Sequence, residues 1–249
     1  WVERRRRIDT LMPPRGVLTP LGKQINSEAP DYAPYVHPSN TAMLFTSRRG
    51  GAASEGEVAY ERNEELYLSQ ISLDSGKWQH AVALPARINS EYNEGSACLN
   101  ADGSVIIFAR CNAPGGQGSC DLYQTRWTSE ATWSAPENLG PQVNSAGWDS
   151  QPCLSPDGKT LFFSSNREGG FGQMDIWQSR KDELGRWGPA ENLGPLINTP
   201  REEMTPFLHG INSTLYFAST GHLHRLGGFD LYKSRWVGSA WEEPRNLGP

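Results

Sequence analysis

The sequence predicts an all-β protein made of short strands, and three observations lead to this prediction. The 249 residues include 26 glycines and 18 prolines, which supply many turns. Aromatic residues make up 10% of the chain, and they are enriched in strands. A sequence pattern also recurs four times, so the same supersecondary unit is repeated along the chain.

Each repeat opens with the string Leu-Gly-x-x-(Ile/Val)-Asn or a close variant. The string stands at Leu21–Asn26, Leu139–Asn144 and Leu193–Asn198, and the variant at Leu84–Asn89. The four asparagines lie 63, 55 and 54 residues apart. The C-terminal residues Asn246–Pro249 begin the string once more.

The interior of each repeat keeps the same register after its asparagine. An acid follows at the fifth position, an aliphatic residue at the tenth and a phenylalanine at the nineteenth. An acid-aliphatic-aromatic triplet and then a tryptophan complete the unit. The phenylalanines are Phe45, Phe108, Phe163 and Phe217.

The third repeat predicts four strands. The first lies near Pro152–Ser155 and ends in the turn Ser155–Gly158, in which Pro and Gly set the turn geometry. The second strand is Thr160–Ser164, and a glycine-rich loop leads to the third at Asp175–Ser179. The fourth is expected from Trp187 to Leu193.

A repeated four-stranded antiparallel unit of this length indicates a β-propeller. One such sheet cannot bury both of its faces, whereas sheets stacked around an axis can. We expect four blades, with five as the alternative, in one domain over residues 21–249. Residues 1–20 form an N-terminal extension that can add an outer strand. The repeats span about 21–83, 84–138, 139–192 and 193–249.

The stretch Ser155–Gly170, followed by Asp175–Trp177, resembles the Pro-Asp-Gly-type, WD-like repeat of the TolB-like β-propellers. The spacer Trp187–Asn198 resembles the version found in bacterial envelope proteins that often carry an OmpA-like peptidoglycan-binding domain. The resemblance covers residues 21–249 and is strongest in the third repeat. It implies a periplasmic or cell-envelope location and a binding or scaffold function.

Equivalent acids stand just before the innermost strand of every blade. A propeller would place them around one end of its central channel, where they could bind a cation or a basic peptide. The alternative is that each acid accepts hydrogen bonds from nearby backbone or from an arginine. Trp148, which has no aromatic counterpart in the other repeats, adds a stacking surface beside them. The predicted ligand-binding residues are Asp31, Glu94, Asp149, Glu203 and Trp148.

The four cysteines predict one disulfide and two buried thiols. Cys111 and Cys120 bracket a glycine-rich loop that can bring them within bonding range, and a disulfide implies an oxidising compartment. Cys98 and Cys153 occupy the same position in adjacent repeats, as small core residues would.

Composition and motifs exclude several classes of function. A pI near 5.6 argues against nucleic-acid binding. No apolar run approaches the roughly 18–20 residues of a membrane span. The sequence contains no Gly-x-Ser-x-Gly, Walker or His-Glu-x-x-His motif, so we predict no catalytic residue, cofactor or metal site. The pair His222 and His224 is assigned to loop surface rather than to a metal.

The leading functional hypothesis is a non-catalytic envelope propeller that binds a protein partner or a cell-wall glycan. The rival hypothesis is a glycan-cleaving, sialidase-like hydrolase with a carboxylate pair on one face. A third alternative is a purely structural module of a longer protein. Family resemblance alone does not decide among them, because fold does not fix function.

Overall fold

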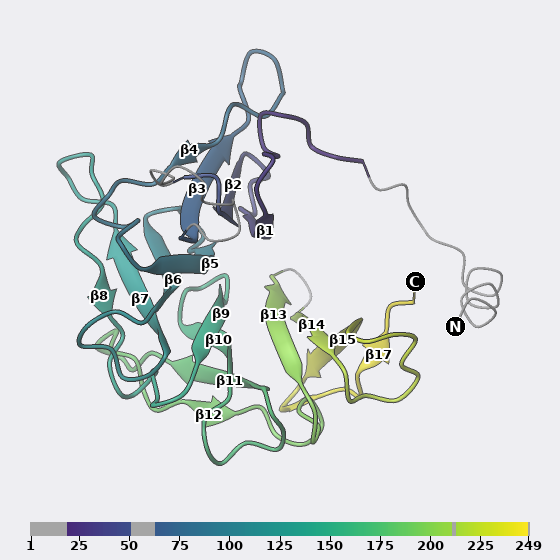
Figure 1. Ribbon diagram of the computed structural model, residues 1–249. Helices are drawn as coiled ribbons and strands as arrows, with labels where there is room; N and C mark the ends of the chain where they lie inside the picture. The colour runs from purple at the N-terminus through teal and green to yellow at the C-terminus, as the bar shows by residue number, and fades with distance from the viewer. Residues whose placement is uncertain (1–18, 51–62, 211–212, 249) are drawn as a thin grey trace, which may run out of the picture.

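The computed structural model describes residues 19–50, 63–210 and 213–248, and this part of the chain is all β. Its strands form four antiparallel sheets, each a propeller blade (Figure 1). Blade 1 contains β1 (Asp31–Val36), β2 (Ala42–Ser47), β3 (Glu65–Gln70) and β4 (Val82–Ala83). The expected extension over residues 1–20 lies almost wholly outside the described residues.

The other blades repeat this order from the axis outwards. Blade 2 contains β5 (Asn93–Leu99), β6 (Val105–Cys111), β7 (Cys120–Arg126) and β8 (Glu137–Asn138). Blade 3 contains β9 (Asp149–Leu154), β10 (Thr160–Ser165), β11 (Asp175–Arg180) and β12 (Glu191–Asn192). Blade 4 contains β13 (Glu203–His209), β14 (Thr214–Ser219), β15 (Asp230–Val237), β16 (Ala240–Trp241) and β17 (Arg245–Asn246).

The outermost strands are shorter than the sequence predicts. In blade 3 only Glu191 and Asn192 pair with β11, whereas a strand from Trp187 to Leu193 was expected. Trp187 pairs separately, through an isolated bridge to Lys181. The chain between these two contacts leaves the sheet, so the outer edge of each blade is held at two points.

Each innermost strand carries a β-bulge two residues after its acid. The residue at the bulge has a positive φ in all four blades although it is never glycine. This conformation is uncommon for such residues, and a bulge bends the strand locally. The bulged residues are Ala33, Ser96, Gln151 and Thr205.

The four blades follow one another around a common axis, with the inner strands nearest the centre (Figure 1). Strand β5 contacts β1 and β9, and β9 contacts β13. The prediction of four blades in an all-β propeller is confirmed. Among the described strands, none of blade 1 contacts any of blade 4.

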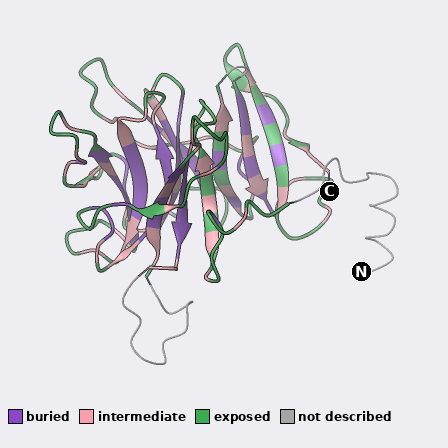
Figure 2. Ribbon diagram, turned by 90° about the horizontal axis from the view of Figure 1, so that it is seen from above, coloured by how far each residue is buried: buried purple, intermediate pink, exposed green. Residues whose placement is uncertain are grey.

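Apolar side chains fill the space between neighbouring blades. Leu44 and Leu66 of blade 1 pack against Phe108 of blade 2, and all three are fully buried. Leu122 packs in the same way against Leu161 and its neighbours in blade 3. Most of the buried residues in Figure 2 lie along these facing strands. Burial between sheets is the main favourable contribution to stability in such a fold.

The repeated asparagine fixes each blade to the blade before it. Asn144 lies in the spacer before blade 3, and its Oδ1 accepts a 2.8 Å hydrogen bond from the Leu122 amide of blade 2. Its Nδ2 donates back to the Leu122 carbonyl at 3.0 Å. Asn89 and Asn198 clamp Leu66 and Ile176 in the same way. We call this two-way contact the asparagine clamp.

Replacing Asn144 with alanine should lower the free energy of unfolding by about 1–3 kcal/mol, because it leaves the buried Leu122 amide and carbonyl without their side-chain partner. The matched control is Asn26→Ala. Asn26 occupies the same repeat position but is exposed, and among the described residues its side chain accepts a hydrogen bond from the Leu21 amide alone. Its replacement should change stability by less than about 0.5 kcal/mol. Urea denaturation measures both, and equal losses would contradict the clamp.

Candidate functional site

The predicted acids begin the innermost strands and are all at the same end of the blades. Glu94, Asp149 and Glu203 are fully buried, and Asp31 is partly buried. Each carboxylate is turned back towards the spacer of its own blade. In blade 3, Asp149 accepts hydrogen bonds from the Ser145 amide at 2.6 Å and from the Ser145 hydroxyl at 2.8 Å.

The environment shifts the pKa of two of these acids in opposite directions. Burial raises the pKa of Glu94 above its usual value, although Ser90 and Arg110 donate hydrogen bonds that oppose the shift. Burial acts in the same sense on Asp31, but hydrogen bonds from Ser47, Arg49 and Ser27 together outweigh it and lower the pKa. Ionisation of Glu94 therefore costs stability in the folded protein, whereas ionisation of Asp31 contributes to it.

An arginine completes the acid site in three blades. In blade 3 the Arg167 guanidinium contacts Asp149 at 2.6 Å and donates to the Val143 carbonyl at 2.6 Å. It lies over the rings of Phe163 and Trp177, 4.9 and 5.0 Å from their centroids. Such cation–π contacts add to the ion pair. Arg49 and Arg110 make the same set of contacts in blades 1 and 2.

Blade 4 replaces this arginine with His222. The imidazole lies near the rings of Phe217 and Tyr232, at 5.5 and 5.1 Å between centroids. Its Nε2 lies 2.8 Å from the Ile197 carbonyl, where the other blades place a guanidinium. Among the described residues Glu203 has no ion pair, and it accepts hydrogen bonds from Thr199 and Ser219 instead.

The structure therefore brings the four acids to equivalent positions, as the repeat predicts, and satisfies each within its own blade. Their predicted contact with a ligand stays a prediction. Trp148 is half-buried, and its amide donates to Asn166 Oδ1 at 2.6 Å. Arg49 and Arg167 each stand four residues after the repeated phenylalanine, so their equivalence can be read from the sequence. Sequence reasoning missed Arg110, which stands two residues after its phenylalanine, and it missed the substitution by His222.

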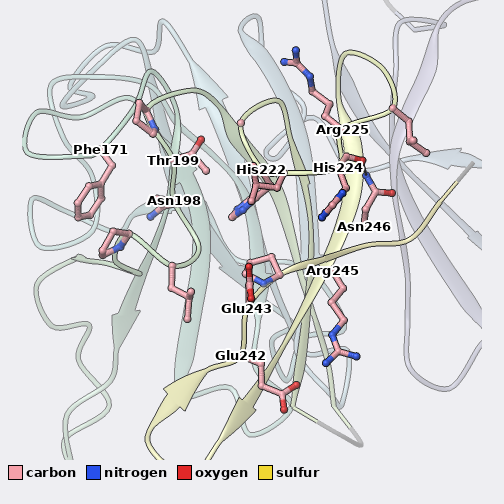
Figure 3. Close-up of a pocket in the computed structure, with 17 residues that line it drawn as sticks. Phe171, Asn198, Thr199, His222, His224, Arg225, Glu242, Glu243, Arg245 and Asn246 are labelled. Carbon is pink, nitrogen blue, oxygen red and sulfur yellow. Dashed lines mark hydrogen bonds between the residues drawn. The ribbon is translucent and has the colours of Figure 1, made fainter. Parts of the chain in front are cut away.

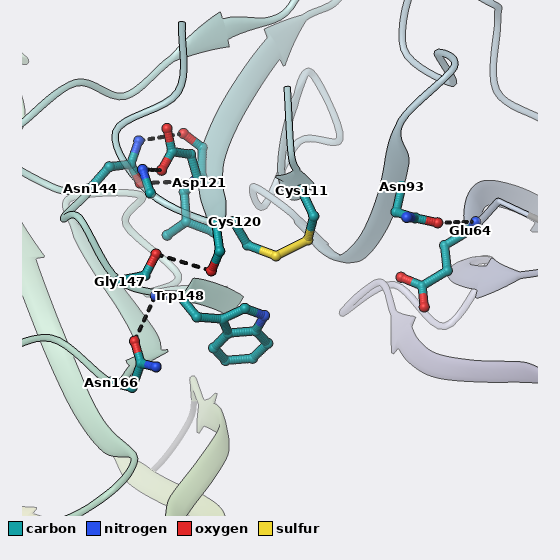
Figure 4. The surroundings of a disulfide bond; sticks show 12 residues. Glu64, Asn93, Cys111, Cys120, Asp121, Asn144, Gly147, Trp148 and Asn166 are labelled. Carbon is teal, nitrogen blue, oxygen red and sulfur yellow. Dashed lines mark hydrogen bonds between the residues drawn. A yellow bond between two sulfur atoms is a disulfide. The ribbon is translucent and has the colours of Figure 1, made fainter. Parts of the chain in front are cut away.

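The predicted disulfide joins Cys111 and Cys120 and is confirmed. The two residues are directly opposite each other at the ends of β6 and β7, so the bond closes the loop of this hairpin. The backbone of Cys120 also bridges to Trp148 of the next blade, and the indole lies beside the disulfide (Figure 4). Cys98 and Cys153 are buried free thiols, as expected.

A groove with a volume of about 1240 Å³ lies at the loop end of blade 4 (Figure 3). Exposed Leu196 of the spacer and Leu223 of the β14–β15 loop line it. Arg225 and Glu243 add charges of both signs. We refer to these four residues and Phe171 as the groove. Sequence reasoning did not find it, because its walls come from four separate loops.

His222 and His224 both line the groove, and both lie in the loop between β14 and β15, as predicted. The described residues contain no group of three or more His, Cys, Asp or Glu side chains placed to hold a metal. They likewise include no helix long and apolar enough to cross a membrane.

Four stacked antiparallel blades with inner strands nearest the axis define this chain as a β-propeller, and its fold is similar to that of TolB proteins. TolB from Acinetobacter baumannii matches with a TM-score of 0.55 at 14% identity, over 91% of this chain and 45% of that chain. A putative TolB from Agrobacterium tumefaciens matches with a TM-score of 0.51 at 18% identity, over 87% and 62%. This chain therefore spans less than two thirds of either protein.

An enzyme shares the same fold. The α-L-arabinofuranosidase from Lactobacillus brevis matches with a TM-score of 0.55 at 12% identity, over 88% of this chain and 75% of that chain. No model of a known protein family matches, and no curated protein matches. At these identities the likeness establishes the fold alone, and fold does not fix function.

Replacing Arg167 with methionine should destabilise the protein by about 3–5 kcal/mol, because the buried Asp149 carboxylate loses its compensating charge. Arg186→Met is the control. Arg186 pairs with Asp182 on the surface, where an ion pair contributes about 0–1 kcal/mol. Chemical denaturation measures the free energy of unfolding of both variants. If both lose a similar small amount, the buried ion pair does not have the proposed structural function.

Replacing Cys111 and Cys120 together with serine should lower the free energy of unfolding by about 2–3 kcal/mol, since the disulfide closes a short loop. Reductant should destabilise the wild-type protein by the same amount and leave the double variant unchanged. Alkylation before reduction, followed by mass spectrometry, checks the bond directly. Two alkylated thiols at these positions in the native protein would show that the bond is absent.

Proposed function

We propose that this chain is a binding module of an oxidising cell-envelope compartment, and that it holds a segment of a protein partner in the groove of blade 4. The groove carries this proposal. Its volume of about 1240 Å³ is sufficient for several side chains. The disulfide and the likeness to TolB support an exported location.

The chemistry of the groove favours a peptide over a glycan. Leu223 and Leu196 are 75% and 43% exposed, and they offer aliphatic contacts to partner side chains. Arg225 and Glu243 can orient a segment that carries both charges. Sugars stack on aromatic faces, and of the groove residues only Phe171 supplies one. The cell-wall glycan and the hydrolase activity stay predictions from sequence.

Selection of peptides from a random library on the native protein, followed by fluorescence anisotropy, tests this function. Selected peptides should bind Leu223→Asp at least about tenfold more weakly, because a carboxylate replaces the apolar contact. Leu184→Asp is the matched control, since Leu184 is also 75% exposed but lies in a turn of blade 3.

Equal binding to both variants would place the peptide elsewhere and contradict the proposal. Peptidoglycan fragments form a second arm of the experiment. If they bind in a Leu223-dependent way and no peptide does, the partner is a glycan and the proposed protein partner is wrong.

A further inference from the structure

The outermost described face of blade 4 exposes an apolar residue whose counterparts in the other three blades are buried. In blades 1 to 3 the residue after the acid that begins the third strand is 0% exposed. These residues are Leu66, Leu122 and Ile176. Leu231 holds the same position in β15 and is 56% exposed. The difference arises because a following blade packs over the first three, whereas no described blade follows blade 4.

Two neighbours of Leu231 on this face behave in the same way. Phe207 of β13 is 43% exposed, whereas its counterparts Cys98 and Cys153 are buried. The counterpart Cys153 accepts a 3.2 Å hydrogen bond from the Leu208 amide of the next blade. Tyr216 of β14 is only half-buried and lies 6.4 Å from the Phe207 ring. We refer to Phe207, Tyr216 and Leu231 as the outer face of blade 4.

The outer face also lacks its polar contact. In the first three blades the asparagine clamp pairs with the amide and carbonyl of the residue equivalent to Leu231. No described side chain takes this place beside Leu231. The rest of the edge is nevertheless the same as in other blades, because the Leu247 amide donates to the Leu231 carbonyl at 2.9 Å as Leu139 does to Leu122 at 3.0 Å.

The three complete interfaces show what fits such a face. Over Ile176 of blade 3, the covering residues are Ile197 of the spacer together with Leu215 and Phe217 of the β14 strand, and Asn198 provides the clamp. All of them belong to one continuous segment, residues 193–219. A segment of this kind therefore supplies both the apolar surface and the amide that the face requires.

We infer that the outer face of blade 4 docks a partner polypeptide that carries this same repeat, with its spacer asparagine clamped to Leu231. The interface continues the three interfaces already present in the chain. It does not involve the groove, which is formed by loops at one end of the blade. A generic apolar ligand would cover Phe207 and Leu231 but could not both accept from and donate to the backbone of Leu231.

The test uses the native protein and a labelled synthetic peptide with the sequence of residues 193–219. Fluorescence anisotropy measures binding, and hydrogen exchange measures protection of the Leu231 amide. The peptide should bind, and it should slow hydrogen exchange of the Leu231 amide about tenfold or more. The exchange rate should then be similar to that of the clamped Leu122 amide. A peptide with the change Asn198→Ala should bind about tenfold more weakly and should not protect the Leu231 amide.

Protein variants provide the second arm. Leu231→Lys should weaken peptide binding at least about tenfold. The matched control Leu73→Lys should leave it unchanged, because Leu73 is 94% exposed in a distant turn of blade 1. Both variants should unfold at the wild-type temperature, since the replaced side chains are exposed. Melting curves followed by circular dichroism verify this.

The inference is overturned if the wild-type peptide does not bind, or if the Asn198→Ala peptide binds equally well. It is also overturned if the protein self-associates in a Leu231-dependent way while the peptide does not bind. A second copy of this chain would then be the occupant. The peptide of residues 193–219 should bind the groove variant Leu223→Asp as tightly as it binds the wild-type protein. The inference and the proposed function can therefore be disproved independently.

Discussion

One side-chain amide determines how neighbouring blades meet. The asparagine clamp pairs the donor and the acceptor of a single residue in the preceding blade, as another strand would. It acts where the outer strands are only two residues long and can supply few ladder hydrogen bonds. Apolar packing supplies most of the stabilisation between blades, but it is not directional. The clamp therefore sets the register in which that packing occurs.

A second constraint is the burial of charge at the loop end. Three blades hold a carboxylate, fully buried in blades 2 and 3 and partly buried in blade 1, beside an arginine that is itself stacked on two rings. Each charge is compensated by an opposite charge and by backbone, which lowers the cost of removing it from water. Blade 4 uses a smaller imidazole at this point. The groove lies beside it, where the repeat departs from its own pattern.

Much of this fold could be predicted from the sequence, because each structural position occurs four times and its residue pattern can be compared among the repeats. The four blades, the acids at the inner strands and the pairing of Cys111 with Cys120 all follow from register and spacing. The bulges at Ala33 and its equivalents could not be predicted, since alanine, serine, glutamine and threonine carry no signal for a positive φ. The function of Arg110 was missed because it stands at a different distance from its phenylalanine than Arg49 and Arg167 do, although its guanidinium reaches the same site. The groove depends on the relative placement of four loops, which spacing does not encode.

The asparagine clamp also limits which residues evolution can accept at these positions. Aspartate has the same shape as asparagine, but its carboxylate only accepts hydrogen bonds. At position 144 one oxygen would still accept from the Leu122 amide, while the other would face the Leu122 carbonyl with no proton between them. Hydrolysis of the side-chain amide, a common form of protein ageing, would make this replacement without any mutation. Each buried asparagine is therefore a point at which one chemical event can weaken the contact between two blades.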